Sequence, residues 1–433
     1  MIKNPANYPK SFSKNKQQQY CVGGHSLETL AKKYGTPLYI IDQETIEENC
    51  KQYTEVLDKY YPDYQIYYAA KANINIGLLD LIAKQGLGAD VVSFGELYTA
   101  LQSQIPNEKL LLHGNNKSDE ELRLAVENKV MIVIDNMDEL IQLRNCLVES
   151  EIAKVLLRFN PDIQTNTHAH IQTGHASSKF GMDKTQCKQA ITFIQSQAQI
   201  QCLGLHSHIG SQILDVEPYL ELVEQSTDFL QTLKKEQGFE VEQLNLGGGM
   251  GIAYTPKDLK VDIKSHLKKI IDLVKVACKK KQLSLPKLLF EPGRSIVGDS
   301  GLTIYQIGRI KTCAKDTYIF VDGGMADNPR PILYGSTYHF SLSSETQREE
   351  KQYQIAGKFC ESGDILGKNI TLPETKAGEF LLVYGTGAYN YAMASNYNRS
   401  RKPAMLLVNK KEERVLVQRE SVADLIAKDQ PLE

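Results

Sequence analysis

Residues 65–92 read QIYYAAKANINIGLLDLIAKQGLGADVV, in which two short apolar runs flank a longer amphipathic stretch. Short runs rich in apolar, β-branched and aromatic residues are typical of buried strands, and the stretch between them is typical of a crossover helix. The same alternation continues to about residue 290. It predicts strands at Gln65–Ala70, Gly88–Val92, Lys109–His113, Val130–Ile134, Ala153–Arg158, Cys202–Ser207, Glu242–Leu246 and Lys287–Phe290.

Segments with helical periodicity follow most of these strands. The clearest examples are Ser118–Asn128, Met137–Ser150, Glu217–Gln237 and Asp258–Lys281. Eight parallel strands that alternate with crossover helices are typical of a closed (β/α)8 barrel. The predicted fold class is therefore α/β, with a TIM-type barrel as its main domain.

The sequence after Gly293 has a different pattern, with strand-like runs broken by Gly, Pro and Asn, and it predicts a mostly β domain. One helical stretch is expected near Ala388–Ser395, and a strand candidate, Pro37–Asp42, suggests that the N-terminal segment folds with this domain. The predicted domains are 43–293 for the barrel and 1–42 plus 294–433 for the β-rich domain. The predicted strands are Leu302–Lys311, Thr317–Val321, Tyr353–Ile355, Phe380–Tyr384, Ala404–Val408 and Arg414–Gln418.

Composition excludes several classes of protein. The 50 Lys and Arg residues nearly balance the 52 Asp and Glu residues, and no basic run resembles a nucleic-acid or membrane-surface site. The N-terminus lacks the apolar core of a secretory signal, and no run of eighteen apolar residues occurs. The eight cysteines show no CxxC spacing, which favours reduced thiols. We therefore expect a cytoplasmic protein without nucleic-acid or membrane partners.

Polar residues and glycines gather at the C-terminal ends of the predicted barrel strands. Barrel enzymes assemble their active sites at this end, so the clustering indicates a functional site more strongly than any single residue does. In strand order, these residues are Lys71, Asp90, His113, Asp135, Arg158, His208, Gly247–Gly249 and Glu291.

Each of these signals also has a structural explanation. Lys71 suits Schiff-base chemistry if burial or a neighbouring charge lowers its pKa, but a solvated lysine at the rim is the commoner case. The glycines in LNLGGGMG are able to approach a phosphate or form a tight turn. The carboxylate of Glu291 is suited to a protonated pyridine and Arg294 to an anion, or the two form a local ion pair.

Further candidates are equally open when taken alone. His206 and His208 suggest zinc, but no third ligand has the right spacing, and no metal is predicted. A second cluster, with His168, His170 and His175, is interpreted as a loop feature. The motif FCESGD contains a thiol beside carboxylates, which suits a proton donor or else a buried cysteine with surface acids. The motif ADNPRPILY presents Arg330 and Tyr334 to a carboxylate, or forms a turn with a solvated arginine.

Taken together, these motifs resemble the fold-type III PLP-dependent decarboxylases, which share an alanine racemase-like barrel. The resemblance covers nearly the whole chain, from GGHSLETLAKKYGTPLYIID onward, and is strongest to the branch that acts on diaminopimelate. It is carried by YYAAKAN, HSHIGSQ, LNLGGG, EPGR, DNPRPILY, CESGD and GAY, in this order.

The resemblance implies pyridoxal 5'-phosphate as the cofactor and assigns a role to each matching residue. Lys71 would bond the cofactor, His208 would stack on its ring, and Cys360 would donate a proton. Cofactor contacts would come from Lys71, Asp90, His208, Ser211, Gly248, Gly249, Glu291, Gly293, Arg294 and Tyr389. Substrate contacts would come from Arg294, Arg330, Tyr334, Glu361 and Tyr389. Cys360 and Glu361 would be supplied across the interface of a homodimer.

The activity implied is decarboxylation of meso-2,6-diaminopimelate to L-lysine and CO2, the last step of lysine biosynthesis. Arg330 and Arg294 would meet the distal carboxylate of this substrate, and Glu361 its distal ammonium. Ornithine and carboxynorspermidine remain alternative substrates, and a catalytically silent regulatory paralogue remains an alternative from another class. Phe94 departs from the pattern because relatives often have a smaller residue there, so we expect it to crowd the cofactor side of the site.

Overall fold

The computed structural model describes residues 7–163 and 179–432, so the histidine cluster at 168–175 lies outside the described residues. By contacts between Cα atoms, the chain forms two compact units. The barrel unit comprises Cys50–Gly251 and Val261–Ser295, and the β unit comprises Met1–Asn49, Ile252–Lys260 and Ile296–Glu433. The predicted domain boundaries, 43–293 and 1–42 plus 294–433, remain a prediction.

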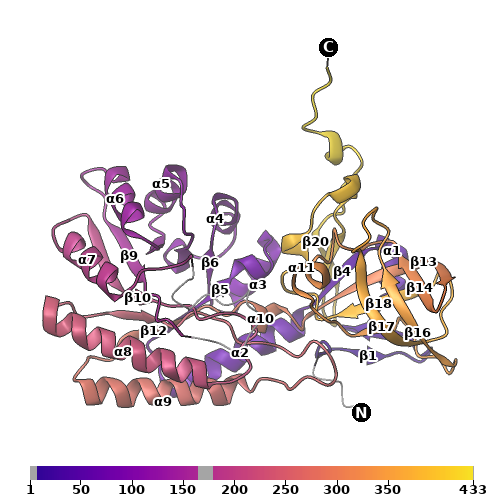
Figure 1. Ribbon diagram of the computed structural model, residues 1–433, viewed down its shortest axis with the longest axis horizontal. Helices are drawn as coiled ribbons and strands as arrows, with labels where there is room; N and C mark the ends of the chain where they lie inside the picture. Colours follow the sequence, from indigo (N-terminus) through magenta and orange to yellow (C-terminus); the bar gives the residue numbers. More distant parts are fainter. Residues whose placement is uncertain (1–6, 164–178, 433) are drawn as a thin grey trace. The chain divides into compact units, whose positions relative to one another are not determined.

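In the described part of the barrel unit, eight parallel strands close into a ring. Figure 1 shows helices of this unit on the outside of its strands. The strands follow one another in chain order, and the last pairs with the first. With helices between the strands, this arrangement confirms the predicted (β/α)8 barrel. The strands are β5 (Tyr64–Ala69), β6 (Gly88–Val91), β7 (Leu110–Leu112), β8 (Met131–Ile134), β9 (Ala153–Arg158), β10 (Ile200–His206), β11 (Gln243–Asn245) and β12 (Lys287–Phe290).

Capping side chains fix the start of several barrel helices. Ser118 and Glu121 form a capping box at one of them, and Asp183 and Gln186 form another. Such boxes satisfy backbone N–H groups that the first helical turn leaves open. The four predicted helices are present, three of them shorter than predicted. The helices are α2 (Gln43–Tyr60), α3 (Ile76–Lys84), α4 (Phe94–Leu101), α5 (Asp119–Glu127), α6 (Met137–Cys146), α7 (Lys184–Gln195), α8 (Glu217–Gln237), α9 (Ile263–Lys281) and α10 (Arg294–Val297).

Apolar side chains fill the interior of the barrel. Their cluster consists of Tyr67, Leu111, Met131, Val133, Leu156, Leu203 and Leu289. The polar residues named above lie at, or directly after, the C-terminal ends of the strands instead. The interior is thus a packed core, and the barrel mouth is the part of this unit that remains for binding and chemistry.

The β unit is built around a nine-stranded sheet in the residues that the structure describes. Within it, β4 (Leu38–Asp42) is antiparallel to β13 (Gly301–Cys313) and parallel to β19 (Ala404–Val408). This pairing confirms that the N-terminal segment folds with the C-terminal β domain. The other strands are β14 (Asp316–Val321), β15 (Phe340–Leu342), β16 (Glu350–Ala356), β17 (Ile365–Pro373), β18 (Phe380–Tyr384) and β20 (Glu413–Val417). A small sheet of β1 (Ser13–Lys14), β2 (Tyr20–Val22) and β3 (His25–Ser26) precedes α1 (Leu27–Tyr34).

The structure corrects the sequence prediction of the β unit in two respects, one helix and several strands. The expected helical stretch near Ala388–Ser395 is only a 3-10 turn, η4 (Tyr391–Met393), because Tyr389 has a φ of 60° and interrupts any helix there. Five strands of this unit, β1, β2, β3, β15 and β17, were not predicted. The longest of them, β17 (ILGKNITLP), carries Gly, Lys and Asn in the middle, a combination that is typical of a turn.

Across the described residues, we find no helix that combines the length and apolar character needed to cross a membrane.

Candidate active site

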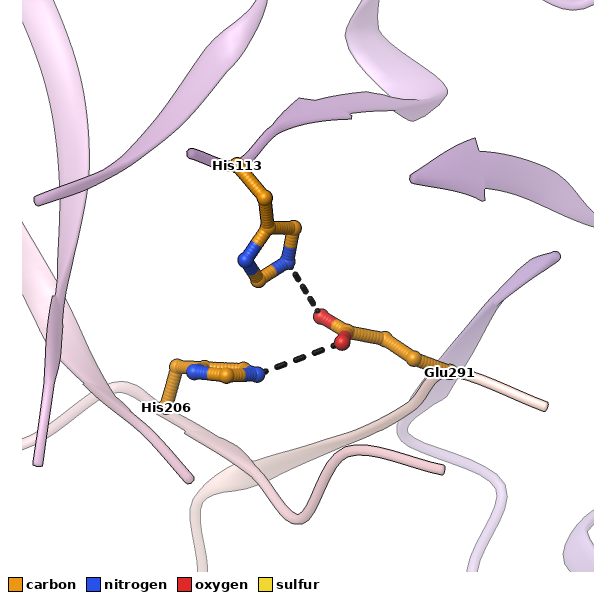
Figure 2. Close-up of side chains that lie close together, drawn as sticks. All are labelled: His113, His206 and Glu291. Atoms are coloured by element: carbon orange, nitrogen blue, oxygen red, sulfur yellow. Dashed lines mark hydrogen bonds and ion pairs between the residues drawn. The ribbon is translucent and has the colours of Figure 1, made fainter. Parts of the chain in front are cut away.

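The carboxylate of Glu291 lies at the barrel mouth, directly after β12, and accepts hydrogen bonds from three other strand ends. His113 Nε2 lies 2.8 Å from its Oε1, and His206 Nε2 lies 3.2 Å from its Oε2 (Figure 2). Asn245 Nδ2 donates to Oε1 at 2.7 Å. These donors belong to the ends of β7, β10 and β11, so the carboxylate is held from three sides of the barrel.

The hydrogen bonds fix the charges in this cluster. Burial raises the pKa of Glu291, but His113 and His206 outweigh that effect and hold the pKa well below its usual value. Burial lowers the pKa of His113 to about 3, although Glu291 opposes the shift, and it lowers the pKa of His206 in the same way. At neutral pH, Glu291 is therefore ionised and both imidazoles are neutral. Because an ionised carboxylate only accepts, each Nε2 carries the hydrogen.

Lys71 and Asp90 lie beside this cluster. Lys71 is half-buried in the short 3-10 helix η1 (Ala70–Ala72), which follows β5. Asp90, in β6, is 2% exposed, and its Oδ1 has no hydrogen-bond partner among the described residues. Burial and the charge of Glu291 raise the pKa of Asp90 well above its usual value, while Lys71 opposes the shift. Burial, followed by the charge of Lys71, lowers the pKa of His208 well below its usual value. These side chains therefore share one electrostatic environment.

The glycines after β11 pack against neighbouring backbone. A Cβ on Gly248 would lie 1.9 Å from the carbonyl oxygen of Glu291. Gly249 has a φ of +105°, and a Cβ there would lie 2.4 Å from the carbonyl oxygen of Gly210. The Gly248 N–H also donates to His208 Nδ1 at 3.4 Å. Glycine is thus required by the close contacts of the protein's own loops, independently of any bound anion.

Arg294 is a buried cation at the same end of the barrel. It is 4% exposed, and its Nη2 donates to Ser211 Oγ at 3.0 Å. Gly293 precedes it, where a Cβ would lie 2.9 Å from the Cβ of Ala69. In the described residues, the ion-pair partners of Glu291 are the two histidines and not Arg294, so the alternative of a local Glu–Arg pair is wrong.

A second group of predicted site residues lies in the β unit, around Arg330 in α11 (Arg330–Tyr334). Arg330 is only 6% exposed, so the alternative of a solvated arginine in a turn is wrong. Its guanidinium lies over the rings of Tyr334 and Tyr389, 5.3 and 5.7 Å from their centroids. It donates to Ser336 Oγ at 3.3 Å, while its buried Nε has no hydrogen-bond partner among the described residues. A buried guanidinium with an unused donor is suited to binding a carboxylate.

The motif FCESGD forms the loop between β16 and β17. Cys360 and Glu361 are exposed, and Asp364 is 3% exposed, so the alternative of a buried cysteine with surface acids is wrong for two of the three residues. Asp364 accepts from the backbone N–H of Phe359 at 2.9 Å and from that of Met325 at 2.7 Å. The buried carboxylate thus fastens the Cys360 loop to the segment that leads into α11.

The predicted residues therefore form two sets. The barrel unit brings together Lys71, Asp90, His208, Ser211, Gly248, Gly249, Glu291, Gly293 and Arg294. The β unit contains Arg330, Tyr334, Cys360, Glu361 and Tyr389. Phe94, expected at the cofactor side, stacks on Tyr98 of the same helix with ring centroids 6.3 Å apart, and Tyr98 is 55% exposed.

Sequence reasoning missed the contacts around Glu291. The place of His113 at a strand end is visible in the sequence, but 178 residues separate it from Glu291. His206 was paired with His208 by spacing, whereas its actual neighbour is His113, with ring centroids 4.6 Å apart. Asn245 carries one faint signal, a polar residue inside an apolar strand that leads into three glycines.

Comparisons with known proteins agree with this geometry. The family model described as "Pyridoxal-dependent decarboxylase, pyridoxal binding domain" matches residues 43–298. The diaminopimelate decarboxylase of Synechocystis sp. is 40% identical, with 99% of this chain and 95% of that protein covered. The diaminopimelate decarboxylase of Bacillus subtilis is 41% identical, with 95% of each covered. A crystal structure of diaminopimelate decarboxylase from M. jannaschii in co-complex with L-lysine has a TM-score of 0.91 at 34% identity and covers 98% of both chains. Because the family model matches more than half of the chain and these relatives match nearly all of it, the chain belongs to the pyridoxal-dependent decarboxylase family.

Proposed function

We propose that this protein is a pyridoxal 5'-phosphate-dependent enzyme that converts meso-2,6-diaminopimelate into L-lysine and CO2, the last step of lysine biosynthesis. The observation that carries the proposal is the ionised carboxylate of Glu291, fixed at the mouth of a barrel that also presents Lys71. When bound, the cofactor supplies an electron sink for the pair left on the α-carbon as CO2 departs, provided that its ring nitrogen stays protonated. Similarity to diaminopimelate decarboxylases over nearly the full length supports the substrate.

The residues at the barrel mouth fit this cofactor. Lys71 would hold the cofactor through its aldehyde, and the carboxylate of Glu291 would bind its ring nitrogen. The buried cation of Arg294, with Ser211, Gly249 and Gly293, suits its phosphate. The orphaned Oδ1 of Asp90 marks a buried polar position that the described residues leave unsatisfied. We assign ring stacking to His208 and a further cofactor contact to Tyr389.

The substrate carries a second amino-acid group, and the residues of the β unit suit it. Arg330 offers a buried, partly unused guanidinium to the distal carboxylate, with Arg294 as a second cation. Glu361 provides a negative charge for the distal ammonium, and Tyr334 and Tyr389 line the position. Neither ornithine nor any other substrate without a distal carboxylate would use Arg330 in this way.

Proton delivery completes the reaction. We assign it to the thiol of Cys360, whose proton would take the place that CO2 leaves on the α-carbon. Cys360 and Glu361 are exposed in the single chain, which suits groups that complete a site in a second copy. We therefore propose a homodimer with shared active sites. We also propose a cytoplasmic location, because all eight cysteines, which lie within the described residues, are free thiols.

A substrate panel tests the function. Protein loaded with pyridoxal phosphate is assayed for CO2 and amine product with meso-diaminopimelate, ornithine, carboxynorspermidine and L-lysine. We expect L-lysine and CO2 from diaminopimelate alone. Faster CO2 release from another member of the panel would refute the substrate, and no release from any of them would favour a silent regulatory paralogue.

Matched lysine variants test the site. Lys71→Ala should abolish both CO2 release and the near-visible absorbance of covalently bound cofactor. Lys84→Ala, at an exposed position in α3, should retain both. Normal cofactor linkage in the Lys71 variant would place the reactive amine elsewhere.

A further inference from the structure

Two buried histidines at the barrel mouth have no part in the proposed reaction. His113 is 6% exposed and His206 is 1% exposed. Their Nε2 atoms point at different oxygens of the same carboxylate, Glu291, from different strand ends (Figure 2). Their rings pack nearly edge to face, at an interplanar angle of 67°. Burying two imidazoles and a carboxylate costs desolvation free energy, so packing alone does not explain this arrangement.

The hydrogen bonds leave one acceptor position on the carboxylate. An ionised carboxylate has about four lone-pair sites, two on each oxygen. Among the described residues, Oε1 accepts from His113 and Asn245, and Oε2 accepts from His206 alone. One lone pair on Oε2 therefore remains for a further donor. The carboxylate cannot turn to offer Oε1 instead without breaking a hydrogen bond.

The charge state of the histidines matters as much as their position. A protonated histidine in contact with Glu291 would neutralise it and remove the electrostatic reason for a ring nitrogen to hold a proton nearby. The neutral imidazoles keep the carboxylate ionised through hydrogen bonds while leaving its full negative charge in place. The other titratable groups that interact electrostatically with Glu291 or with its two histidines are Tyr67, Lys71, Asp90, Arg158 and His208.

We propose that His113 and His206 are positioning residues for Glu291: as neutral donors they hold its carboxylate ionised and leave a lone pair of Oε2 for the cofactor's protonated ring nitrogen. The proposal rests on cofactor binding, which is part of the proposed function, but not on the identity of the substrate. It assigns to these histidines control of the proton on the ring nitrogen.

A metal site is the competing interpretation of the same residues. The ligand atoms of His113, His206 and Glu291 lie within 4.8 Å of one another, and neutral imidazoles with a carboxylate are common metal ligands. However, both Nε2 atoms already lie at hydrogen-bonding distance from the carboxylate. A metal bound there would occupy the same lone pairs as the ring nitrogen, so the two functions exclude each other.

The test uses protein loaded with 15N-labelled pyridoxal phosphate, in the absence of substrate. The 15N chemical shift of the ring nitrogen reports whether it is protonated. His113→Leu removes the donor, and His113→Gln keeps a neutral N–H donor in its place. We expect the shift to move toward that of an unprotonated pyridine in the Leu variant and to stay near the wild-type value in the Gln variant. Turnover should fall about 10- to 100-fold in the Leu variant with little change in KM, which is the loss of a hydrogen bond to a charged group.

Three results would overturn the proposal. The first is a wild-type shift and wild-type turnover in the Leu variant. The second is a Gln variant that behaves like the Leu variant although its thermal unfolding matches that of the wild type. The third is a stoichiometric metal ion in the cofactor-loaded protein. Because the shift is read without substrate, failure of the diaminopimelate assay would leave this test intact.

Discussion

Two buried charges, Glu291 and Arg330, differ in how the surrounding protein satisfies them. Glu291 accepts hydrogen bonds from three neutral side chains, so its charge is stabilised without being neutralised. Arg330 is as deeply buried, but it meets only hydroxyl groups and two aromatic faces, and its Nε is orphaned among the described residues. The first arrangement is preorganised for a cationic group and the second for an anionic one.

Replacing Arg330 tests this difference. In Arg330→Met, the substrate loses a charge-assisted hydrogen bond of about 2–3 kcal/mol, so KM for diaminopimelate should rise about 30- to 150-fold. The free energy of unfolding should not fall, because the variant buries an apolar chain in place of an incompletely satisfied cation. Steady-state kinetics and urea unfolding measure the two effects. An unchanged KM would remove Arg330 from the substrate site.

The pKa of His113 predicts a dependence of stability on pH. An unfolded chain protonates histidine near pH 6.5, whereas folded His113 does so only near a pKa of about 3. Between these values the unfolded state binds more protons, so the free energy of unfolding falls as the pH is lowered, by up to about 1.4 kcal/mol per pH unit for this residue. Urea unfolding at several pH values gives the free energy of unfolding of the cofactor-free protein as a function of pH. In His113→Gln, the slope of this free energy against pH should be shallower by about that amount. Equal slopes would mean that His113 titrates alike in both states.

Elements position these residues through the loops that follow the strands. The turn after β11 lies against the loops after β10 and β12, and the space that a side chain would need is filled by their carbonyl groups. In the β unit, Asp364 performs the corresponding task by bonding two loops through their backbone N–H groups. In both units, backbone contacts between loops therefore fix the positions of the Cα atoms that carry the functional side chains.

Two glycine substitutions compare a position where a Cβ would clash with neighbouring backbone and a helical position where it would not. In Gly248→Ala, a Cβ would lie 1.9 Å from the Glu291 carbonyl oxygen and must displace that backbone. We therefore expect the free energy of unfolding to fall by about 2 kcal/mol or more and cofactor binding to weaken. Gly95→Ala, in α4, meets nothing within 4 Å and should stabilise the protein by about 0.5 kcal/mol. Thermal unfolding and cofactor titration measure both. A Gly248 variant as stable as the wild type would contradict the close contact.

At the scale of the whole molecule, the barrel unit carries the predicted cofactor residues except Tyr389, and the β unit carries the predicted substrate residues except Arg294. Cys360 and Glu361 are exposed, which suits side chains that complete the active site of a second copy of the chain. The homodimer thus becomes a prediction about function, because a site completed by the partner is active only in the assembly.

Complementation between inactive variants tests the shared site. Lys71→Ala and Cys360→Ala should each be inactive as homodimers. After random mixing, half of the dimers carry both variants and one intact site each, so activity should return to about one quarter of the wild-type level. Mixing Lys71→Ala with Glu291→Gln, both in the barrel unit, should restore nothing. No recovery in mixed dimers of the first pair would place Cys360 in the same chain's site.

The sequence alone determined the order of strands and helices, and with it the barrel, because burial of parallel strands requires a pattern of apolar runs that can be read locally. It also located Lys71, Glu291 and the glycines at strand ends. Tertiary structure decided which of these residues touch. The contacts of His113 with Glu291 and of Arg330 with Tyr389 join segments far apart in the chain. The spacing of these residues in the sequence does not predict their contacts, because barrel closure and loop packing bring them together.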